Sequence, residues 1–277
     1  MPVFERPPLE SLTPARERWT PLYLEHGRLE VDDSSVKWIG ADRTVFRIPV
    51  ATLSTVLLGP GTTATQAAMK ACGESNTPVC WVGDEGLRFY CLGDSPTHNS
   101  DNARRQAKTW AVKRHREAVA RAMFSRRFPG VDVSDKSIGE LRTMEGLRVK
   151  GLYAELGARH GVTWKGRRYD PNNWDVSDNV NKAVSAANAA LYALTLAVIW
   201  SMGFLPQLGF VHSSGPLALV YDFADLYKPE TSLPAAFQAV AIKADAGNRE
   251  VLTLLKLRIE EVGVMRRLPK DLKALIS

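Results

Sequence analysis

Residues Ala183–Val211, AVSAANAALYALTLAVIWSMGFLPQLGFV, decide the fold of this chain, because the stretch has no charged residue. Its section Ala189–Phe204 is strongly apolar, and about 20 such residues would be enough to cross a bilayer. Asn188, Ser201 and the many alanines make it a weak membrane segment, so a buried central helix over about 177–203 is the better interpretation. We therefore predict a globular domain built around this helix, with no membrane partner.

The segments on either side of this stretch also have helical patterns. Residues 101–128 are predicted to form one long helix, with nine Lys and Arg residues against two acidic ones. The excess lacks the interleaved Glu that helical ion pairs would need, so a polyanion partner is favoured over a merely solvated face. Ser137–Glu140 (SIGE) matches a capping box and predicts a helix that runs to about His160. Another helix is expected over 216–229, and two more are expected to complete the chain.

The first third of the chain has a different pattern, in which apolar and polar residues alternate between turn residues. This alternation indicates half-buried antiparallel strands. Strands are expected at residues 20–25, 28–31, 36–39, 52–58, 78–82 and 87–92, with a short helix at about 65–72. The prediction is an α+β fold, with a strand-rich domain at residues 1–93 and a nearly all-α domain at residues 94–277.

Composition indicates a globular and basic protein. The 277 residues are 45% hydrophobic and carry a formal net charge of +6. Cys72, Cys80 and Cys91 form no CxxC pair, which argues for free thiols in a reducing cytoplasm. The first residues contain no apolar run of the kind found in signal peptides, so we expect a cytoplasmic protein.

Four residues in the helical part are candidates for a catalytic site. Asp222 and Asp225 lie three apart in a segment expected to be helical, so they fall on one face. His212 precedes them, and Glu145 lies far upstream on another helix rich in basic residues. Carboxylates grouped with a histidine among Lys and Arg suggest a divalent ion held close to phosphates. Metal-assisted phosphodiester chemistry is therefore the first hypothesis.

Three of these candidates can also be weighed against a purely structural role. Glu145 has Arg142 and Arg148 nearby, so a surface ion pair is the favoured interpretation when it is considered alone. His212 follows an apolar run, and a buried, hydrogen-bonded histidine is the favoured interpretation when this residue is considered alone. Asp222 differs from both, because a carboxylate in so apolar a helix is costly unless it is paired or bound to a metal.

The sequence contains no motif for nucleotide hydrolysis. A Walker motif, GxSxG, HExxH and a kinase signature are all missing, so ATP use is not supported. The polar loop over 164–174 instead mixes Arg167 and Arg168 with Tyr169 and Trp174, a combination typical of nucleic-acid surfaces. A loop anchored in the core is the alternative interpretation.

Three strings occur together and in a characteristic order: Met144–Gly146 (MEG), Val162–Pro171 (VTWKGRRYDP) and Gly209–Asp225 (GFVHSSGPLALVYDFAD). They resemble the integrase subunit of the CRISPR adaptation machinery, most closely its I-E branch. The likeness runs from about residue 16 to about residue 245 and keeps the order of every motif.

The resemblance implies an architecture and an activity. It implies an N-terminal β-sandwich, a helical catalytic domain and a homodimer, with two such dimers flanking a dimer of a small ferredoxin-like partner in a heterohexamer. The implied substrates are double-stranded DNA with single-stranded ends and CRISPR repeat DNA. The implied reaction joins the 3′-hydroxyl ends of short DNA fragments to the edge of a repeat by transesterification.

The resemblance also assigns roles to single residues. It implies that Glu145, His212 and Asp225 bind Mg²⁺ or Mn²⁺ and that Asp222 beside them contributes to activity. Two family contacts to the DNA duplex would fall on Lys70 and Arg88. Contacts along the single-stranded overhang would fall on Arg167, Lys228 and Arg249. His26 stands where relatives have an aromatic residue, usually Tyr, that stacks on the end of the duplex, so its end-bracketing role is an open expectation.

Two rival functions share these sequence features. A metal-dependent endonuclease acting on branched or single-stranded DNA needs the same ion with water as the nucleophile, and strand-transfer products would distinguish the two. A non-catalytic DNA-binding scaffold would tolerate the loss of Glu145. The scaffold is disfavoured, because carboxylates close to phosphates weaken binding unless a cation lies between them.

Overall fold

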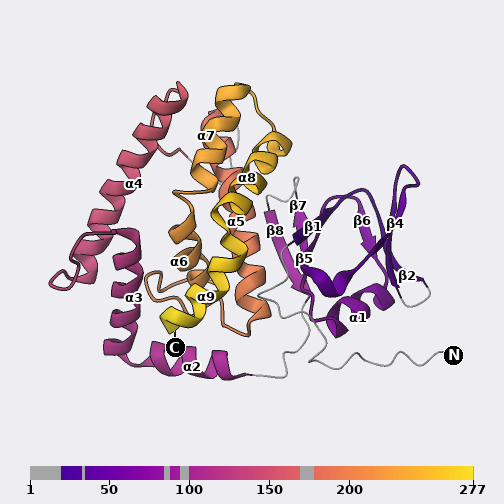
Figure 1. Cartoon of the computed structure of the whole chain (residues 1–277), viewed down its shortest axis with the longest axis horizontal. Helices are drawn as coiled ribbons and strands as arrows, with labels where there is room; N and C mark the ends of the chain where they lie inside the picture. Colours follow the sequence, from indigo (N-terminus) through magenta and orange to yellow (C-terminus); the bar gives the residue numbers. More distant parts are fainter. Residues whose placement is uncertain (1–19, 33–34, 84–87, 94–99, 169–177, 277) are drawn as a thin grey trace.

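A strand-rich part is followed along the chain by helices, which confirms the predicted α+β fold (Figure 1). The structure is a computed structural model that describes residues 20–32, 35–83, 88–93, 100–168 and 178–276. Strands predominate among the described residues up to Gly93, and helices predominate from Asp101 onward. The division into two separate domains at residue 93 stays a prediction.

Two four-stranded sheets make up the strand-rich part. One has the order β1 (Thr20–Leu24), β5 (Leu53–Leu58), β7 (Val79–Gly83), β8 (Arg88–Gly93). The other has the order β4 (Val45–Ile48), β3 (Ser35–Gly40), β2 (Gly27–Asp32), β6 (Thr62–Ala64). The chain between β4 and α1 also forms the short 3-10 helix η3 (Val50–Thr52), and α1 itself spans Gln66–Glu74 with Thr65 as its N-cap.

The prediction that the strands are antiparallel is wrong for three strand pairs. The pairs β1–β5, β5–β7 and β2–β6 are parallel, whereas β2–β3, β3–β4 and β7–β8 are antiparallel. Parallel neighbours need a crossover connection. Between β1 and β5 the chain builds β2 to β4 of the other sheet, and between β5 and β7 it passes through α1. Alternation within a strand carries no information about that path.

The core of the strand-rich part lies between its two sheets and α1. Leu29 of β2 and Val56 of β5 are completely buried, and Cys72 of α1 joins the same cluster. This packing agrees with the expected sandwich-like architecture. Burial raises the pKa of the Cys72 thiol to about 11, so this thiol stays protonated and unreactive near neutral pH.

Helix α5 (Asn179–Ser201) packs against the outer face of the first sheet. Ala197 of this helix lies in one cluster with Cys80 and Val82 of β7. Of the described helices, α5 alone is long and apolar enough to span a membrane, but 72% of its most apolar window is buried inside the protein. A helix at the centre of a globular fold has the same properties, which agrees with the sequence prediction. Figure 1 shows α5 between the sheets on the right and helices α3, α4 and α6 on the left.

The single basic helix predicted over 101–128 is wrong, because the chain forms α2 (Asp101–Ala111) and α3 (Lys113–Arg127). Val112 between them is extended, with φ −93° and ψ 112°. Side chains of α2 bind the loop that follows α5: Gln106 Nε2 donates to the carbonyls of Leu205 and Leu208, and Trp110 Nε1 donates to that of Gly209. These contacts fix the direction of α2, so the two helices meet at an angle (Figure 1).

Three helices follow the one predicted over 216–229, where the sequence predicted two. Besides α2, α3 and α5, the described helices of this half are α4 (Ile138–His160), α6 (Ala218–Tyr227), α7 (Ser232–Ile242), α8 (Asn248–Val262) and α9 (Val264–Ile276). Gly263 separates the last two, because its left-handed backbone (φ 68°) ends α8.

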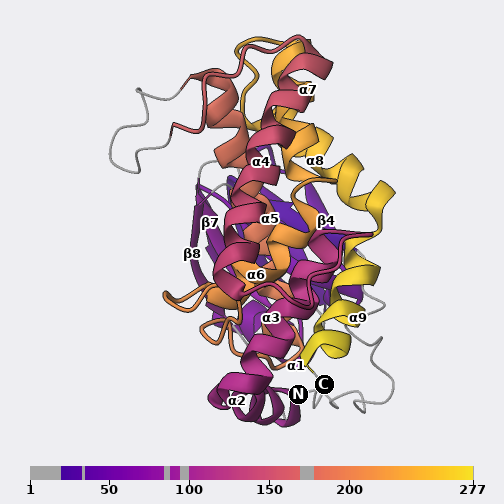
Figure 2. The ribbon, with the colours of Figure 1, turned by 90° about the vertical axis from the view of Figure 1, so that its left-hand side faces the viewer.

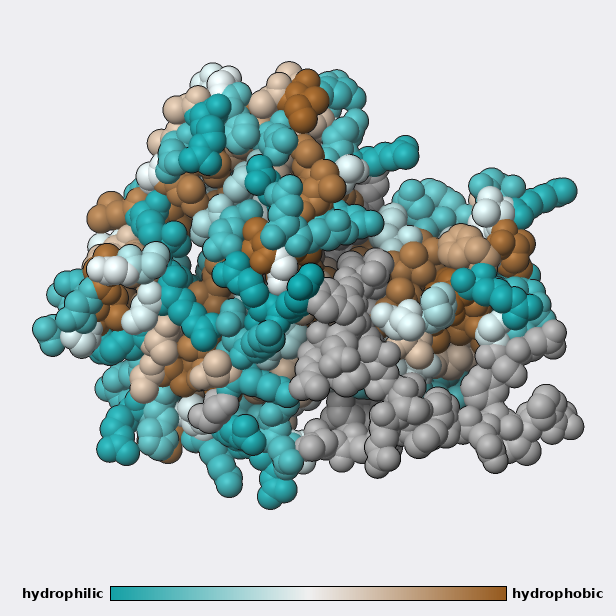
Figure 3. Space-filling view, in the orientation of Figure 1, coloured by the Kyte–Doolittle hydropathy of each residue, from teal (hydrophilic) through white to brown (hydrophobic). Residues whose placement is uncertain are grey.

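In Figure 2, α4 lies in front of α5 and α6, and Figure 3 shows mainly hydrophilic residues over the outer face of the helical part.

The capping box predicted at Ser137–Glu140 is present and begins α4. Ser137 Oγ accepts from the Glu140 amide at 3.2 Å, and Glu140 Oε2 accepts from the Ser137 amide at 2.7 Å. Both amides would otherwise lack a partner inside the helix. The first turn of the helix that carries Glu145 is therefore fixed by a local bond.

Ser137→Ala should lower the free energy of unfolding by about 0.5–2 kcal/mol, because the cap bond is lost. Ser100 is the matched control: it is the N-cap residue of α2 but makes no side-chain cap bond. Urea denaturation of Ser137→Ala and Ser100→Ala measures both. Equal losses in the two variants would contradict the capping assignment.

Candidate functional site

The buried carboxylate of Asp222 organises the loop that precedes α6. Asp222 has no exposed surface. Its Oδ2 accepts from the amides of Phe210 (2.5 Å) and Val211 (3.0 Å), and its Oδ1 accepts from the amide of His212 (2.8 Å). Three amide donors compensate for the burial of the charge, so Asp222 is a structural ligand of the loop over 210–212.

Gly209 allows this loop to pass directly against the start of α6. A Cβ atom at residue 209 would lie 2.3 Å from the carbonyl oxygen of His212 and 2.7 Å from the backbone carbon of Ala218. Both neighbours are backbone, so neither can move aside easily. Only glycine fits at this position, which explains the Gly that begins the GFVH string.

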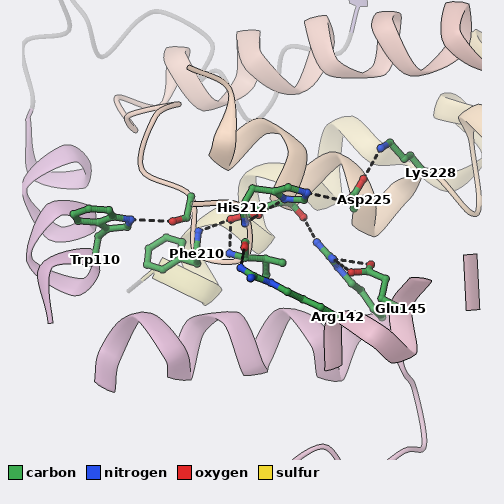
Figure 4. A network of polar contacts seen from close by, with 11 residues as sticks. Trp110, Arg142, Glu145, Phe210, His212, Asp225 and Lys228 are labelled. Atoms are coloured by element: carbon green, nitrogen blue, oxygen red, sulfur yellow. Dashed lines mark hydrogen bonds and ion pairs between the residues drawn. The ribbon is translucent and has the colours of Figure 1, made fainter. Parts of the chain in front are cut away.

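His212 is held by one aspartate and faces the other. Its ring Nδ1 lies 2.8 Å from Asp222 Oδ1, and its Nε2 lies 3.9 Å from Asp225 Oδ2 (Figure 4). Because Asp222 accepts from the amide and from Nδ1, the neutral ring carries its proton on Nδ1 and has its lone pair on Nε2. The prediction that Asp222 and Asp225 share one face of a helix is confirmed, since one imidazole contacts both.

Glu145 is paired with a buried arginine of α3. Arg127 Nη1 lies 2.6 Å and 2.5 Å from the two carboxylate oxygens of Glu145. Its Nη2 donates to the backbone carbonyl of Asp222 at 2.8 Å. The Arg127 side chain is fully buried and that of Glu145 is 16% exposed. The surface ion pair that the sequence favoured for Glu145 is therefore wrong: this pair is largely buried and joins α3, α4 and α6.

Asp225 is paired with Lys228 one turn further along. Lys228 Nζ lies 2.5 Å from Asp225 Oδ1 and 4.6 Å from the centre of the Tyr192 ring. Burial alone would raise the pKa of Asp225, but the charges of Lys228 and Arg127 outweigh it and hold this pKa below its usual range. Burial would likewise lower the pKa of Lys228, yet Asp225 raises it, so the pair is ionised.

A cavity of ≈ 960 Å³ opens above these side chains. Glu145, His212 and Asp225 line it, together with the cationic residues Arg142, Arg148, Lys150, Arg167 and Lys228. Tyr153 and Trp164 form one wall, with their rings stacked at 4.5 Å. Acids therefore meet cations at one concave surface, which suits an anionic ligand that carries its own counter-ion.

The structure brings together only some of the residues predicted to bind DNA. Arg167 lines the cavity, anchored by Asn181 Oδ1 at 2.9 Å and by Ser185 Oγ at 2.7 Å. Lys228 lines it too. Lys70 and Arg249 are exposed on α1 and α8, outside the cavity lining.

The other predicted contacts lie in the strand-rich part or outside the described residues. Arg88 is on β8, opposite Gly83. His26 is exposed in the turn between β1 and β2, with a left-handed backbone (φ 53°). Tyr169 and Trp174 of the predicted aromatic and basic loop lie outside the described residues.

The role of Arg127 was not predicted from the sequence, because its helix was interpreted as a basic surface for a polyanion. Several arginines of this helix have internal partners: Arg116 donates to the Trp110 carbonyl, Arg121 to the Val133 carbonyl, and Arg126 pairs with Asp271. The available signal was local, since Arg127 is adjacent to Phe128 and three residues after Phe124, both buried. A cation between two core residues needs an anion.

The chemical types of the ligand atoms in the cavity suit Mg²⁺ or Mn²⁺. Glu145 and Asp225 offer carboxylate oxygens, and Asp222 leaves the Nε2 lone pair of His212 directed at the cavity, an arrangement common in metal sites. Among the described residues, no three His, Cys, Asp or Glu side chains lie close enough together to enclose an ion. Arg127 and Lys228 hold the two carboxylates instead.

Fold and sequence place the chain among the CRISPR-associated proteins. A family model described as "CRISPR associated protein Cas1" matches residues 22–131 and 125–244, and the chain belongs to the Cas1 family. It is 42% identical to "CRISPR-associated endonuclease Cas1 2" of Chlorobaculum tepidum over 269 residues, which is 97% of this chain and 91% of the relative. It is 38% identical to Cas1 of Escherichia coli K12 over 240 residues, 86% of this chain and 78% of the relative.

Solved structures give the same fold. The structure named "Crystal structure of TtCas1-DNA complex" has a TM-score of 0.74 and 37% identity, covering 94% of this chain and 97% of that one. "Casposase bound to integration product" has a TM-score of 0.68 at 14% identity, covering 92% and 90%. "Partial Cas6-RT-Cas1--Cas2 complex" has a TM-score of 0.60 at 17% identity, covering 93% and 94%. The last two share the fold alone.

Arg127→Met should lower the free energy of unfolding by about 3–5 kcal/mol, because it leaves Glu145 without its buried partner. Arg159→Met is the matched control: it breaks the pair with Glu155 on α4, in which the side chains are 61% and 59% exposed. Such exposed pairs contribute about 0–1 kcal/mol. Chemical denaturation of both variants measures the difference, and equal losses would show that the Arg127 pair is not buried in solution.

Proposed function

We propose that this chain is a DNA integrase of CRISPR adaptation, of the I-E branch, that joins the 3′-hydroxyl ends of short DNA to the edge of a CRISPR repeat. The observation that carries the proposal is the cavity in which His212 Nε2 faces Asp225, with Glu145 and several cations in the same wall. Membership of the Cas1 family supports it, as does the 38% identity to E. coli Cas1.

The proposed reaction exchanges one phosphodiester for another. The 3′-oxygen of the incoming fragment attacks the phosphorus of the repeat strand, and the 3′-oxygen of that strand leaves with the proton that the attacking hydroxyl gives up. The exchange does not require hydrolysis of ATP, which agrees with the missing nucleotide-binding motifs. Glu145, His212 and Asp225 are the residues that would hold Mg²⁺ or Mn²⁺, and the bound ion would supply charge stabilisation to the phosphoryl transfer.

The side chains of the cavity have separable tasks in this proposal. Asp222 fixes the ring of His212, so that Nε2 points to the reacting phosphate region. Arg127 holds Glu145 from the buried side and leaves the opposite side of its carboxylate to the cavity. The cations of the lining contact DNA phosphates, and Arg167 is positioned for this by Asn181.

We also propose the partners that this reaction needs. They are double-stranded DNA with single-stranded ends, CRISPR repeat DNA, a second copy of the chain and a small ferredoxin-like protein in a heterohexamer. Support comes from fold relatives named as complexes with DNA and with Cas2. Cytoplasmic localisation is proposed because Cys72, Cys80 and Cys91 form no disulfide with one another.

A metal-dependent endonuclease that cuts branched or single-stranded DNA is the second candidate. The curated relatives are named endonucleases, which favours it. The same acids and histidine would serve, with water in place of the 3′-hydroxyl. The two functions therefore differ in the nucleophile and in the product.

Glu145→Gln, His212→Ala and Asp225→Asn should each abolish joining of a labelled short DNA to a plasmid that carries a repeat. The three residues lie at the reacting centre, whereas DNA affinity comes from the cations around it. Glu155→Gln, on the exposed side of α4, is the control and should retain activity. Gel analysis in Mg²⁺ or Mn²⁺, with and without chelator, measures the product.

The product also decides between the candidates. Branched or joined DNA from the unaltered chain supports the integrase, whereas free cleaved ends alone support the endonuclease. Retained joining in any two of the three variants would refute this assignment of the site.

His26→Tyr should match or exceed the unaltered chain in affinity for duplex ends, because stacking of an aromatic ring on a base contributes about 1–3 kcal/mol and phenol is larger than imidazole. His26→Asn is the informative loss variant, since Asn tolerates the left-handed backbone of His26 (φ 53°) and removes only the ring. Its affinity should fall. Fluorescence anisotropy with blunt and frayed duplexes measures all three, and identical affinities would show that His26 does not contact the duplex end.

A further inference from the structure

The two acids of the cavity each carry a protein cation, and the two cations differ in how firmly they are held. Arg127 is fully buried and spends its second nitrogen on the carbonyl of Asp222. Its guanidinium also lies 5.4 Å from the centre of the Phe124 ring. Leaving Glu145 would strand a buried charge, so Arg127 is a permanent part of the fold.

Lys228 also lies beside an aromatic ring, but it is held less firmly than Arg127. It stands at the C-cap of α6, its side chain is 20% exposed, and it lines the cavity. Its ammonium ends a flexible four-carbon stem and contacts Asp225 Oδ1 at 2.5 Å. The same ammonium lies 4.6 Å from the centre of the Tyr192 ring, whose face attracts a cation wherever that cation moves over it. Lys228 can therefore leave Asp225 and stay within the cavity.

Lys228 and a metal ion would compete for the same carboxylate. Asp225 Oδ1 is taken by Lys228, and Asp225 Oδ2 faces His212 Nε2 at 3.9 Å. A divalent cation that binds Asp225 and His212 would lie within a few ångströms of the ammonium. Like charges that close repel strongly in a partly buried site. The Lys228–Asp225 pair and a metal ion on Asp225 thus oppose each other.

We propose that Lys228 is an exchangeable counter-ion: a divalent cation displaces it from Asp225, and the released ammonium then binds a phosphate of DNA in the cavity. The proposal rests on the proposed function, because it assumes that Asp225 is a metal ligand. Arg167, Arg142 and Arg148 in the same lining mark where a phosphate chain would run. Lys228 thereby joins two binding events that use different surfaces of one cavity.

This exchange makes metal binding and DNA binding favour each other. Each ligand removes Lys228 from the position that opposes the other, because DNA draws the ammonium away from Asp225 and the metal frees it for DNA. Coupling between two sites is reciprocal, so each ligand raises the affinity of the other by the same factor, usually roughly 5–150-fold. Without the ammonium, this contribution to the coupling disappears.

Lys228→Met tests the exchange through metal affinity, measured from free Mn²⁺ by electron paramagnetic resonance on the full-length chain. Lys228→Met should bind Mn²⁺ about 5-fold or more tightly than the unaltered chain in the absence of DNA. Lys228→Arg keeps the cation and should bind Mn²⁺ no more tightly than the unaltered chain. Lys243→Met, which removes a lysine from the exposed pair with Glu250, is the control for a change in net charge.

The second measurement repeats the Mn²⁺ titration with a short duplex that has single-stranded ends. DNA should raise Mn²⁺ affinity in the unaltered chain and have much less effect in Lys228→Met. Circular dichroism and the Mn²⁺-induced rise in melting temperature report whether each variant is folded, and Lys228→Gln replaces Lys228→Met if that variant unfolds.

The outcomes separate this proposal from the proposed function. Unchanged Mn²⁺ affinity in Lys228→Met, with weakened binding in His212→Ala, would overturn the exchange and leave the metal site standing. If His212→Ala binds Mn²⁺ as the unaltered chain does, or if the unaltered chain binds none, the metal site itself is wrong. Tighter binding in Lys228→Met but not in Lys243→Met, with loss of coupling to DNA, supports the exchange.

Discussion

The site depends on the cost of burying the carboxylate of Asp222. A fully buried charge must be solvated by the protein, and here the amides of residues 210–212 and the ring of His212 do so. The same requirement draws the loop against α6, which only Gly209 permits. The imidazole is thereby fixed in orientation and tautomer. One desolvation constraint thus sets the loop path, the helix approach and the direction of Nε2.

The parts of the fold that sequence predicts are those governed by local chemistry. The apolar stretch around Ala189–Phe204 forms the central helix, and Ser137 caps α4 through a bond to its own neighbour three residues on. The pairing of strands was not predictable in the same way. Parallel and antiparallel neighbours have the same alternation, and the choice depends on the route of the chain between β1 and β5. The break at Val112 likewise depends on distant contacts of Trp110.

The residues of the candidate site likewise differ in whether local sequence is enough to predict their roles. Asp222 could be predicted, because a carboxylate in an apolar helix needs compensation wherever it is placed. The partner of Glu145 could not, because Arg127 lies 18 residues away in sequence and looks like one more cation of a basic helix. Lys228 was expected as a contact for DNA, whereas the structure places it on Asp225. Spacing identifies which groups are chemically suitable, and tertiary packing decides which of them meet.

Helix α5 sets a fixed distance between the strand-rich part and the cavity. Asn181 near one end anchors Arg167, Tyr192 lies beneath Lys228, and Ala197 rests on the first sheet. At 1.5 Å of rise per residue, Asn181 and Ala197 are ~24 Å apart along the axis. A buried helix cannot stretch, so any molecule that contacts the sheet and the cavity at once must span this fixed length. Inserting or deleting a single residue in α5 would alter both that length and, by about 100°, the direction of every contact beyond it.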